Sequence, residues 1–140
     1  MIHMEYNLSM ALDHSEKVSI NVGTVDLGQV DLLVEQGLYS NRSDFFRTAI
    51  RNQVKSHEQI IQQNMAGRMI SLGIIEYSKE TLEEYAASNQ KLNISVIGMG
   101  SLADDVTPEL ALATIAKVKV FGSFKCSPAV RDAIKDRIIK

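Results

Sequence analysis

The pattern of apolar and polar positions near the start of the chain predicts a short β-strand over residues 17–22. Apolar and polar side chains alternate there with a period of two, so one face is apolar and the other polar. The apolar positions are Val18, Ile20 and Val22, and the polar positions are Lys17, Ser19 and Asn21. No neighbouring segment offers a partner strand, and a lone strand leaves its backbone donors and acceptors unpaired. We therefore expect it to pair with the same strand of a second copy, as a two-stranded antiparallel ribbon.

The residues after this strand predict two helices. Apolar residues recur at helical spacing from about Val25 to Gln36, and Gly37 suits the left-handed position that follows a helix. Ser40 or Asn41 can cap the second helix, in which apolar residues again recur at helical spacing. A strand followed by two helices is thus expected over residues 15–56.

The helical pattern continues beyond this region, because apolar residues at intervals of four extend it to Leu72. One long helix and two helices with a bend near residues 56–57 both fit the pattern, and Gly73 is the expected terminator. A short strand is then predicted over residues 74–77, followed by a helix that Ser78 caps.

The last third of the chain contains two similar segments, each with a strand that ends at a glycine, a loop and an apolar helix start. The strands are Asn93–Gly98 and Lys117–Gly122, and the helix starts are Thr107-Pro108 and Ser127-Pro128. A hydroxyl residue before a proline is a favourable helix N-terminus. The spacing fits strand–helix solenoid repeats, although a small α+β domain with coincidental similarity is the alternative. Two repeats are too few to stand alone, so we expect them to dock on the preceding helices or stack against a second subunit.

These elements predict an α+β chain with three parts. Residues 1–14 show no clean periodicity and are expected to form an N-terminal arm. Residues 15–56 form the strand and two helices of the dimerising module. Residues 57–140 form a helical connector and a small α/β domain with two strand-loop-helix repeats, which would serve assembly or effector response.

Composition narrows the class of protein. Hydrophobic content of 45% and charged content of 23% are typical of folded proteins. The single cysteine, Cys126, cannot form an internal disulfide, so a reducing compartment is expected. Neither a signal peptide nor a membrane-spanning apolar run is recognisable, so the prediction is a cytoplasmic protein without a membrane partner.

A paired ribbon of this kind fits the major groove of double-stranded DNA, which makes DNA the predicted partner. Lys17, Ser19 and Asn21 are of the types that read base edges, although a solvated strand face is the simpler reading. The helix start at residues 40–43 offers backbone N–H groups, hydroxyls and a guanidinium that suit a phosphate, although plain capping also explains it.

Charge limits the size of any DNA contact. The chain has a net charge of −2, and residues 1–60 hold five Lys and Arg against eight Asp and Glu. Residues 41–56 are locally basic, with one acidic residue, Asp44, against the four basic residues Arg42, Arg47, Arg51 and Lys55. We therefore expect few phosphate contacts, modest affinity for each dimer, and several dimers along the DNA.

Two short motifs point to a known family. The second helix opens with Arg42-Ser43 and continues with Thr48-Ala-Ile-Arg51. With the preceding strand and helix, residues 16–55 resemble the ribbon-helix-helix superfamily of Arc, MetJ and CopG, and within it the CopG-type regulators. The proline that such proteins often have near the strand end is missing, since Val22-Gly23-Thr24 stands there.

The resemblance implies an obligate homodimer that acts as a sequence-specific transcriptional regulator, most simply a repressor. Carried over position by position, base reading falls on Lys17, Ser19 and Asn21. Phosphate binding falls on Asn41, Arg42 and Ser43. The alternative is an antitoxin or scaffold whose C-terminal region binds a protein partner.

The sequence offers little support for a catalytic, cofactor-binding or metal-binding site. We therefore expect no enzyme activity, no cofactor and no metal site. The histidines and the cysteine show no spacing typical of metal ligands; they are His3, His14, His57 and Cys126. Residues 98–103 fit the dinucleotide-binding pattern G-x-G-x-x-A, but Asp104-Asp105 follow where a helix should open. Two glycines at a turn are the expected explanation.

Overall fold

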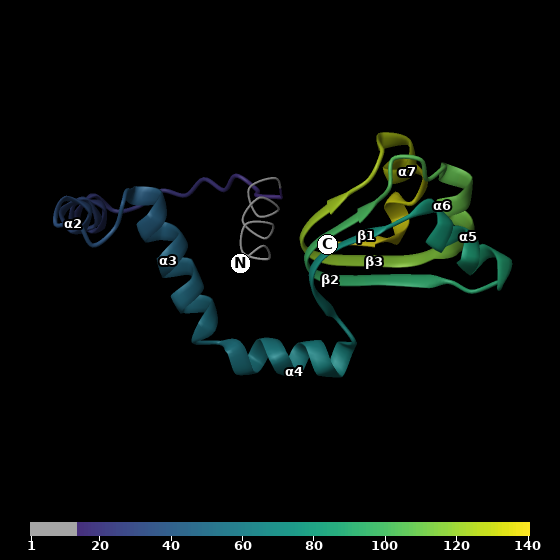
Figure 1. Ribbon diagram of the computed structural model, residues 1–140, viewed down its shortest axis with the longest axis horizontal. Coiled ribbons are helices and arrows are strands. Elements are labelled where there is room, and N and C mark those ends of the chain that lie inside the picture. Colours follow the sequence, from purple (N-terminus) through teal and green to yellow (C-terminus); the bar gives the residue numbers. More distant parts are fainter. Residues whose placement is uncertain (1–13) are drawn as a thin grey trace, which may run out of the picture. The chain divides into compact units, whose positions relative to one another are not determined.

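The computed structural model describes residues 14–140; the region expected to form the N-terminal arm lies almost entirely outside the described residues (Figure 1). The described chain divides into two compact units. One is Ser15–Gln63, and the other contains Asn64–Lys140.

The first unit is built from helices. Helix α2 spans Thr24–Glu35 and α3 spans Arg42–Lys55, each within a few residues of the prediction. Gly37 has φ +82° and ends α2 as expected, because the N–H of Leu38 donates to the carbonyl oxygen of Leu33 at 3.1 Å. This bond closes the Schellman arrangement that a left-handed glycine permits.

The helical pattern from α3 onward forms two helices and not one long helix, because α3 ends at Lys55 and α4 spans Glu58–Arg68. The break lies at residues 56–57, as the second of the two alternatives predicted. The predicted extension to Gly73 is wrong. Met69 has φ +52°, which stops the helix, and Leu72 and Gly73 lie within strand β1 (Ser71–Tyr77). The position of Leu72 fits both the 3.6-residue period of a helix and the two-residue period of a strand. Pairing of this segment with another strand decides in favour of the strand.

The second unit contains a sheet of four parallel strands among the described residues, in the order β1-β2-β3-β4. Strand β2 spans Leu92–Leu102, β3 spans Ile115–Lys125, and β4 is the short segment Ile138–Ile139. The helices between them are α5 (Lys79–Ala87), α6 (Pro108–Thr114) and α7 (Pro128–Ala133), with a 3-10 turn at Lys135–Arg137.

Three strand–helix repeats are present where the sequence predicted two, because β1 and α5 form a copy before the two expected ones. Each helix is capped in the same way, by a hydroxyl oxygen that accepts a backbone N–H three residues later. The donors and acceptors are Thr81 to Ser78, Leu110 to Thr107, and Val130 to Ser127, at 3.1, 3.2 and 3.3 Å. The first repeat has Lys79 after its capping residue, where the other two repeats have proline. The sequence comparison therefore did not identify it as a repeat.

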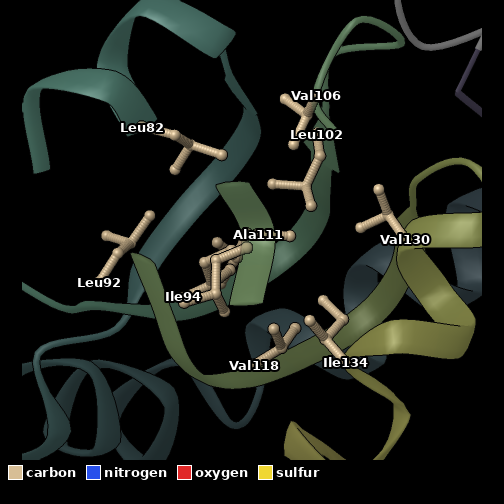
Figure 2. Packing of buried hydrophobic residues seen from close by; sticks show 11 residues of the cluster. Leu82, Leu92, Ile94, Leu102, Val106, Ala111, Val118, Val130 and Ile134 are labelled. Atoms are coloured by element: carbon tan, nitrogen blue, oxygen red, sulfur yellow. The ribbon is translucent and has the colours of Figure 1, made fainter. Parts of the chain in front are cut away.

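The core of this unit lies between the helices and one face of the sheet (Figure 2). Leu82 of α5, Ala111 of α6 and Val130 of α7 are completely or almost completely buried, in one cluster with Ile94 and Val118 of the sheet. The opposite face of the sheet carries no helix of this cluster. Its apolar side chains are more exposed, with Leu72 at 65% and Phe121 at 40%.

A row of glycines crosses the middle of the sheet. Gly73, Gly98 and Gly122 lie opposite one another in the register and have φ of +138°, +128° and +122°. A Cβ atom on Gly98 would overlap the carbonyl oxygen of Gly73, and one on Gly122 would overlap that of Gly98. The strands pack this closely only because the side chains are missing.

This row corrects two predictions. The strands do not end at Gly98 and Gly122 but continue to Leu102 and Lys125. Gly98 and Gly100 therefore do not form a turn. Gly100 is buried, and a Cβ there would press on Val120 at 3.2 Å, so both glycines of the G-x-G pattern serve packing within the sheet.

Candidate nucleic-acid interface

The segment predicted to read DNA precedes α2. Residues 17–23, which include the predicted strand, are assigned to neither a helix nor a strand in the single described chain. Lys17, Ser19 and Asn21 are all exposed. The three side chains are therefore available to a ligand, and none of them contributes to a core within the first unit.

The apolar side of the same segment is also uncovered. Val18 is 80% exposed and Ile20 is 76% exposed. Exposed apolar side chains recur on the following helices, at Val25, Leu32, Ile50, Val54 and Ile60. Among residues 15–63 of the described chain only Val30 is buried. One buried side chain contributes little against the entropy of folding a unit of this size, and an exposed apolar surface of this kind is typical of an interaction site.

The start of α3 is closed by two reciprocal hydrogen bonds. The amide oxygen of Asn41 accepts the N–H of Asp44 at 2.8 Å, and the Asp44 carboxylate accepts the N–H of Ser40 at 2.9 Å. Sequence reasoning left the cap open between Ser40 and Asn41, and the structure assigns it to Asn41. The cap leaves the amides of Arg42 and Ser43 pointing out of the helix start, where they suit an anion.

Arg42 has a partner that the sequence did not reveal. Its Nε donates to Oδ1 of Asp31 at 2.7 Å, and Nη2 donates to Oδ2 at 2.8 Å. This bidentate pair joins α2 to α3, and both side chains remain about half exposed. The Arg42 hydrogen bond holds the pKa of the Asp31 carboxyl below its usual value. Two of the five N–H donors of the guanidinium are used in this pair, which leaves three for a phosphate.

The remaining basic side chains of α3 follow one line along the helix. Arg47, Arg51 and Lys55 are four residues apart, which places them on the same face, and all three are exposed. With Arg42 they form the local positive patch that the composition predicted. The patch has few charges, as expected for a small phosphate footprint.

A second basic site lies in the other unit and was not predicted. A shallow pocket on the sheet is lined by Arg68, Asn93, Ile94, Ser95, Lys117 and Lys119. Arg68 and Lys119 both lie over the ring of Phe121, 5.4 and 4.9 Å from its centroid. Lys119 is partly buried there, so the aromatic face takes the place of a carboxylate in holding these cations.

Features of other site classes are few in the described part of the chain. Residues 14–140 contain no group of three or more His, Cys, Asp or Glu side chains placed to hold a metal ion, and His3 lies outside the described residues. Burial raises the pKa of the Cys126 thiol, which disfavours the reactive thiolate. None of the described helices is both long enough and apolar enough to cross a membrane.

One comparison with known proteins gives a match. The model of the ribbon-helix-helix transcriptional regulator family matches residues 13–131, which is most of the chain. No curated protein and no solved structure matches. The match runs from the segment before α2 into α7, so the strand–helix repeats belong to the family pattern as well, where the sequence resemblance had covered residues 16–55 alone.

Proposed function

Since the chain belongs to the ribbon-helix-helix transcriptional regulator family, we propose that it is a sequence-specific DNA-binding repressor that acts as a homodimer. The family indicates a DNA-binding regulator of transcription. The repressor role, the dimer and the residue assignments below are the proposal. In this proposal the chain is a binding protein and not an enzyme.

The observation that carries the proposal is the exposed segment before α2. Its apolar side chains, Val18 and Ile20, are uncovered, while the polar side chains alternate with them. Pairing of two such segments across a dyad satisfies the backbone of both and buries the apolar side against the helices of the dimer. The same pairing turns Lys17, Ser19 and Asn21 to one surface, where they read base edges in the major groove.

The start of α3 positions the ribbon on the DNA backbone in this proposal. The amides of Arg42 and Ser43 and the Ser43 hydroxyl bind a phosphate. Asn41 uses its amide oxygen for the cap, so its amide N–H₂ remains to donate to the same phosphate. Arg42 contributes the donors that Asp31 does not use.

Two substitutions separate these roles. Asn21→Ala should relax base preference by about 1–3 kcal/mol at one position of the operator, with little change in fold. Arg42→Ala should weaken all sequences alike and lower the salt slope by about one charge. The measurement is binding to a selected operator and to unrelated DNA at several salt concentrations.

The outcomes decide the proposal. If both variants bind operator and unrelated DNA as the parent does, the assignment of the site is wrong. If the parent shows no preference among sequences in a genomic selection, but co-purifies with a stoichiometric protein, the antitoxin or scaffold role replaces the repressor role.

A further inference from the structure

The glycine row of the second unit is open at both ends. At the β1 edge, Gly73 keeps the left-handed φ of +138°, yet a Cβ on it would meet nothing within 4 Å. At the other edge, β4 pairs with β3 only at Val118 and Lys119, so it stops before Gly122. Within the sheet, the carbonyl oxygen of one glycine fills the space beside the glycine of the next strand. At the β1 edge, the space beside Gly73 has no such oxygen. At the β3 edge, the carbonyl oxygen of Gly122 has no next glycine.

We infer that copies of this chain stack head to tail through these edges, with β1 of one copy laid parallel to β3 of the next. If the glycine row continues, Gly122 lies opposite Gly73 of the neighbouring copy. The register within the sheet then sets Val120 opposite the neighbour's Ser71, because both residues pair with Val96 at the same level. The added strand begins one position beyond β4, which is a rise of about 3.3 Å along the β3 edge. Lys140 must therefore turn away from the edge to admit Ser71 of the neighbouring copy.

The side chains match at this register. On the helix-free face, Phe121 and Leu72 occupy one row, so the contact places these two partly exposed apolar side chains side by side. Glu76 and Lys125 occupy another row, so each Lys125 lies beside a carboxylate of the next copy. Opposite charges and apolar pairs on adjacent strands each stabilise a sheet.

The charges of the first and last segments of the second unit favour head-to-tail stacking over pairing of β1 with β1 across a two-fold axis. The first repeat, residues 71–87, holds one basic residue, Lys79, against four glutamates, Glu76, Glu80, Glu83 and Glu84. The last segment, residues 123–140, holds two aspartates, Asp132 and Asp136, against five basic residues, Lys125, Arg131, Lys135, Arg137 and Lys140. Head-to-tail contact joins ends of opposite charge, whereas pairing of β1 with β1 across a dyad joins two acidic ends.

Such a contact is heterologous, so it repeats from copy to copy and builds rows, or a ring where the rotation between copies closes. The occupant of each edge is a second copy of the same chain. The inference does not depend on DNA binding, and its test uses the full chain without DNA.

A disulfide ladder tests the register. Cysteines at Leu72 and Phe121 are placed together in a Cys126→Ser background. Within one chain these positions are two strands apart, about 10 Å, which is too far for a disulfide. Between stacked copies they are on adjacent strands, within bonding range. We expect mild oxidation to give a ladder of covalent multimers on a non-reducing gel, and each single-cysteine variant to give none.

Charge reversal tests the same contact in solution. Glu76→Lys should weaken association beyond the dimer by about tenfold in sedimentation velocity, because the introduced ammonium group would face Lys125 of the next copy. Adding Lys125→Glu should restore it to within about threefold of the parent. Asp105→Lys, the same change of charge in an exposed loop of the middle repeat, serves as the control and should leave association unchanged.

The inference fails if the parent never exceeds one discrete species over a wide range of concentration. It also fails if the double-cysteine variant gives no ladder, or if Leu72→Cys alone cross-links, which would indicate β1 pairing across a dyad. An equal effect of Glu76→Lys and Asp105→Lys would likewise overturn it. None of these outcomes alters the assignment of Lys17, Ser19 and Asn21, which the DNA-binding measurements test separately.

Discussion

The two units of this chain differ in how much of their apolar surface they bury within a single copy. In Ser15–Gln63 the described residues bury one side chain, Val30, and leave the segment before α2 and much of the helices exposed. In Asn64–Lys140 the helices α5, α6 and α7 each contribute a buried side chain to one cluster against the sheet. The first unit is incomplete as a single copy, whereas the second has its own core.

This contrast assigns different roles to a second copy. In the proposed dimer, the second copy supplies the core that the first unit lacks, so we expect folding and dimer formation to be one event. For the second unit, a partner adds only an edge contact to a domain that is already folded. The first association should therefore be strong and obligatory, and the second weaker and dependent on concentration.

The largest expected effect tests whether the second unit has an independent core. Leu82→Ala removes a side chain that is 0% exposed and should lower the free energy of unfolding of this unit by about 2–5 kcal/mol. Urea unfolding of the full chain measures the change. Leu112→Ala makes the same chemical change at a side chain that is 40% exposed, and it should cost less than about 1 kcal/mol. Equal losses from the two variants would refute the core described above.

The next effect tests whether the first unit depends on a partner. Ile20 is 76% exposed in the single chain, so Ile20→Lys is harmless there and costly only if the dimer covers this side. We expect the dimer dissociation constant to rise by about 10- to 100-fold, as measured by sedimentation at low concentration. Ser19→Lys places the same charge on the other face of the segment and should leave the dimer intact. If Ile20→Lys has no effect, the paired ribbon is excluded.

The smallest effect concerns the contact that joins α2 to α3. Asp31→Asn removes the carboxylate that engages Arg42, so the whole guanidinium becomes available to a phosphate. Affinity for DNA should rise by about two- to fivefold at low salt, since a nearby negative charge is also lost. Glu35→Gln, one turn further along α2, removes an equal charge without a contact to Arg42 and should give a smaller gain. A loss of affinity in Asp31→Asn would show that the pair orients Arg42 for DNA.

The pH dependence of this contact follows from the direction of its pKa shift. The hydrogen bond from Arg42 lowers the pKa of Asp31 in the folded chain below its ordinary value of 3.8. Its stabilising contribution is complete above that ordinary value and is lost only as the pH falls through the lower folded value. The difference in the free energy of unfolding between the parent and Asp31→Asn should therefore stay constant from pH 8 to pH 5. A change in that difference within this range would contradict the assignment of the contact.

The two associations together bear on how an operator is occupied. If each dimer makes few phosphate contacts, as the acidic composition suggests, edge contacts between neighbouring dimers would raise occupancy through effective concentration. Glu76→Lys would then reduce cooperativity on DNA with adjacent sites and leave binding to a single site unchanged. This outcome links the proposed function to the inferred stacking without making either one depend on the other.

The sequence alone determined those features that rest on local chemistry. Gly37 ended α2, and Ser78, Thr107 and Ser127 capped their helices as predicted, because a cap or a left-handed glycine depends on neighbours within a few residues. The family resemblance was also correct, since the Arg42-Ser43 and Thr48–Arg51 motifs are local. The assignments of Lys17, Ser19, Asn21, Asn41, Arg42 and Ser43 to DNA stay predictions.

Tertiary structure decided what depends on partners distant in the sequence. Leu72 fitted both a helix and a strand, and only pairing with β2 settled it, which in turn revealed the first of three repeats. Gly98 and Gly122 resembled strand ends, but the carbonyl of the neighbouring strand is what requires glycine there. Asp31 and Arg42 are eleven residues apart and meet only because two helices pack together. Local rules assign each residue its permitted conformations, and the packing of remote segments selects among them.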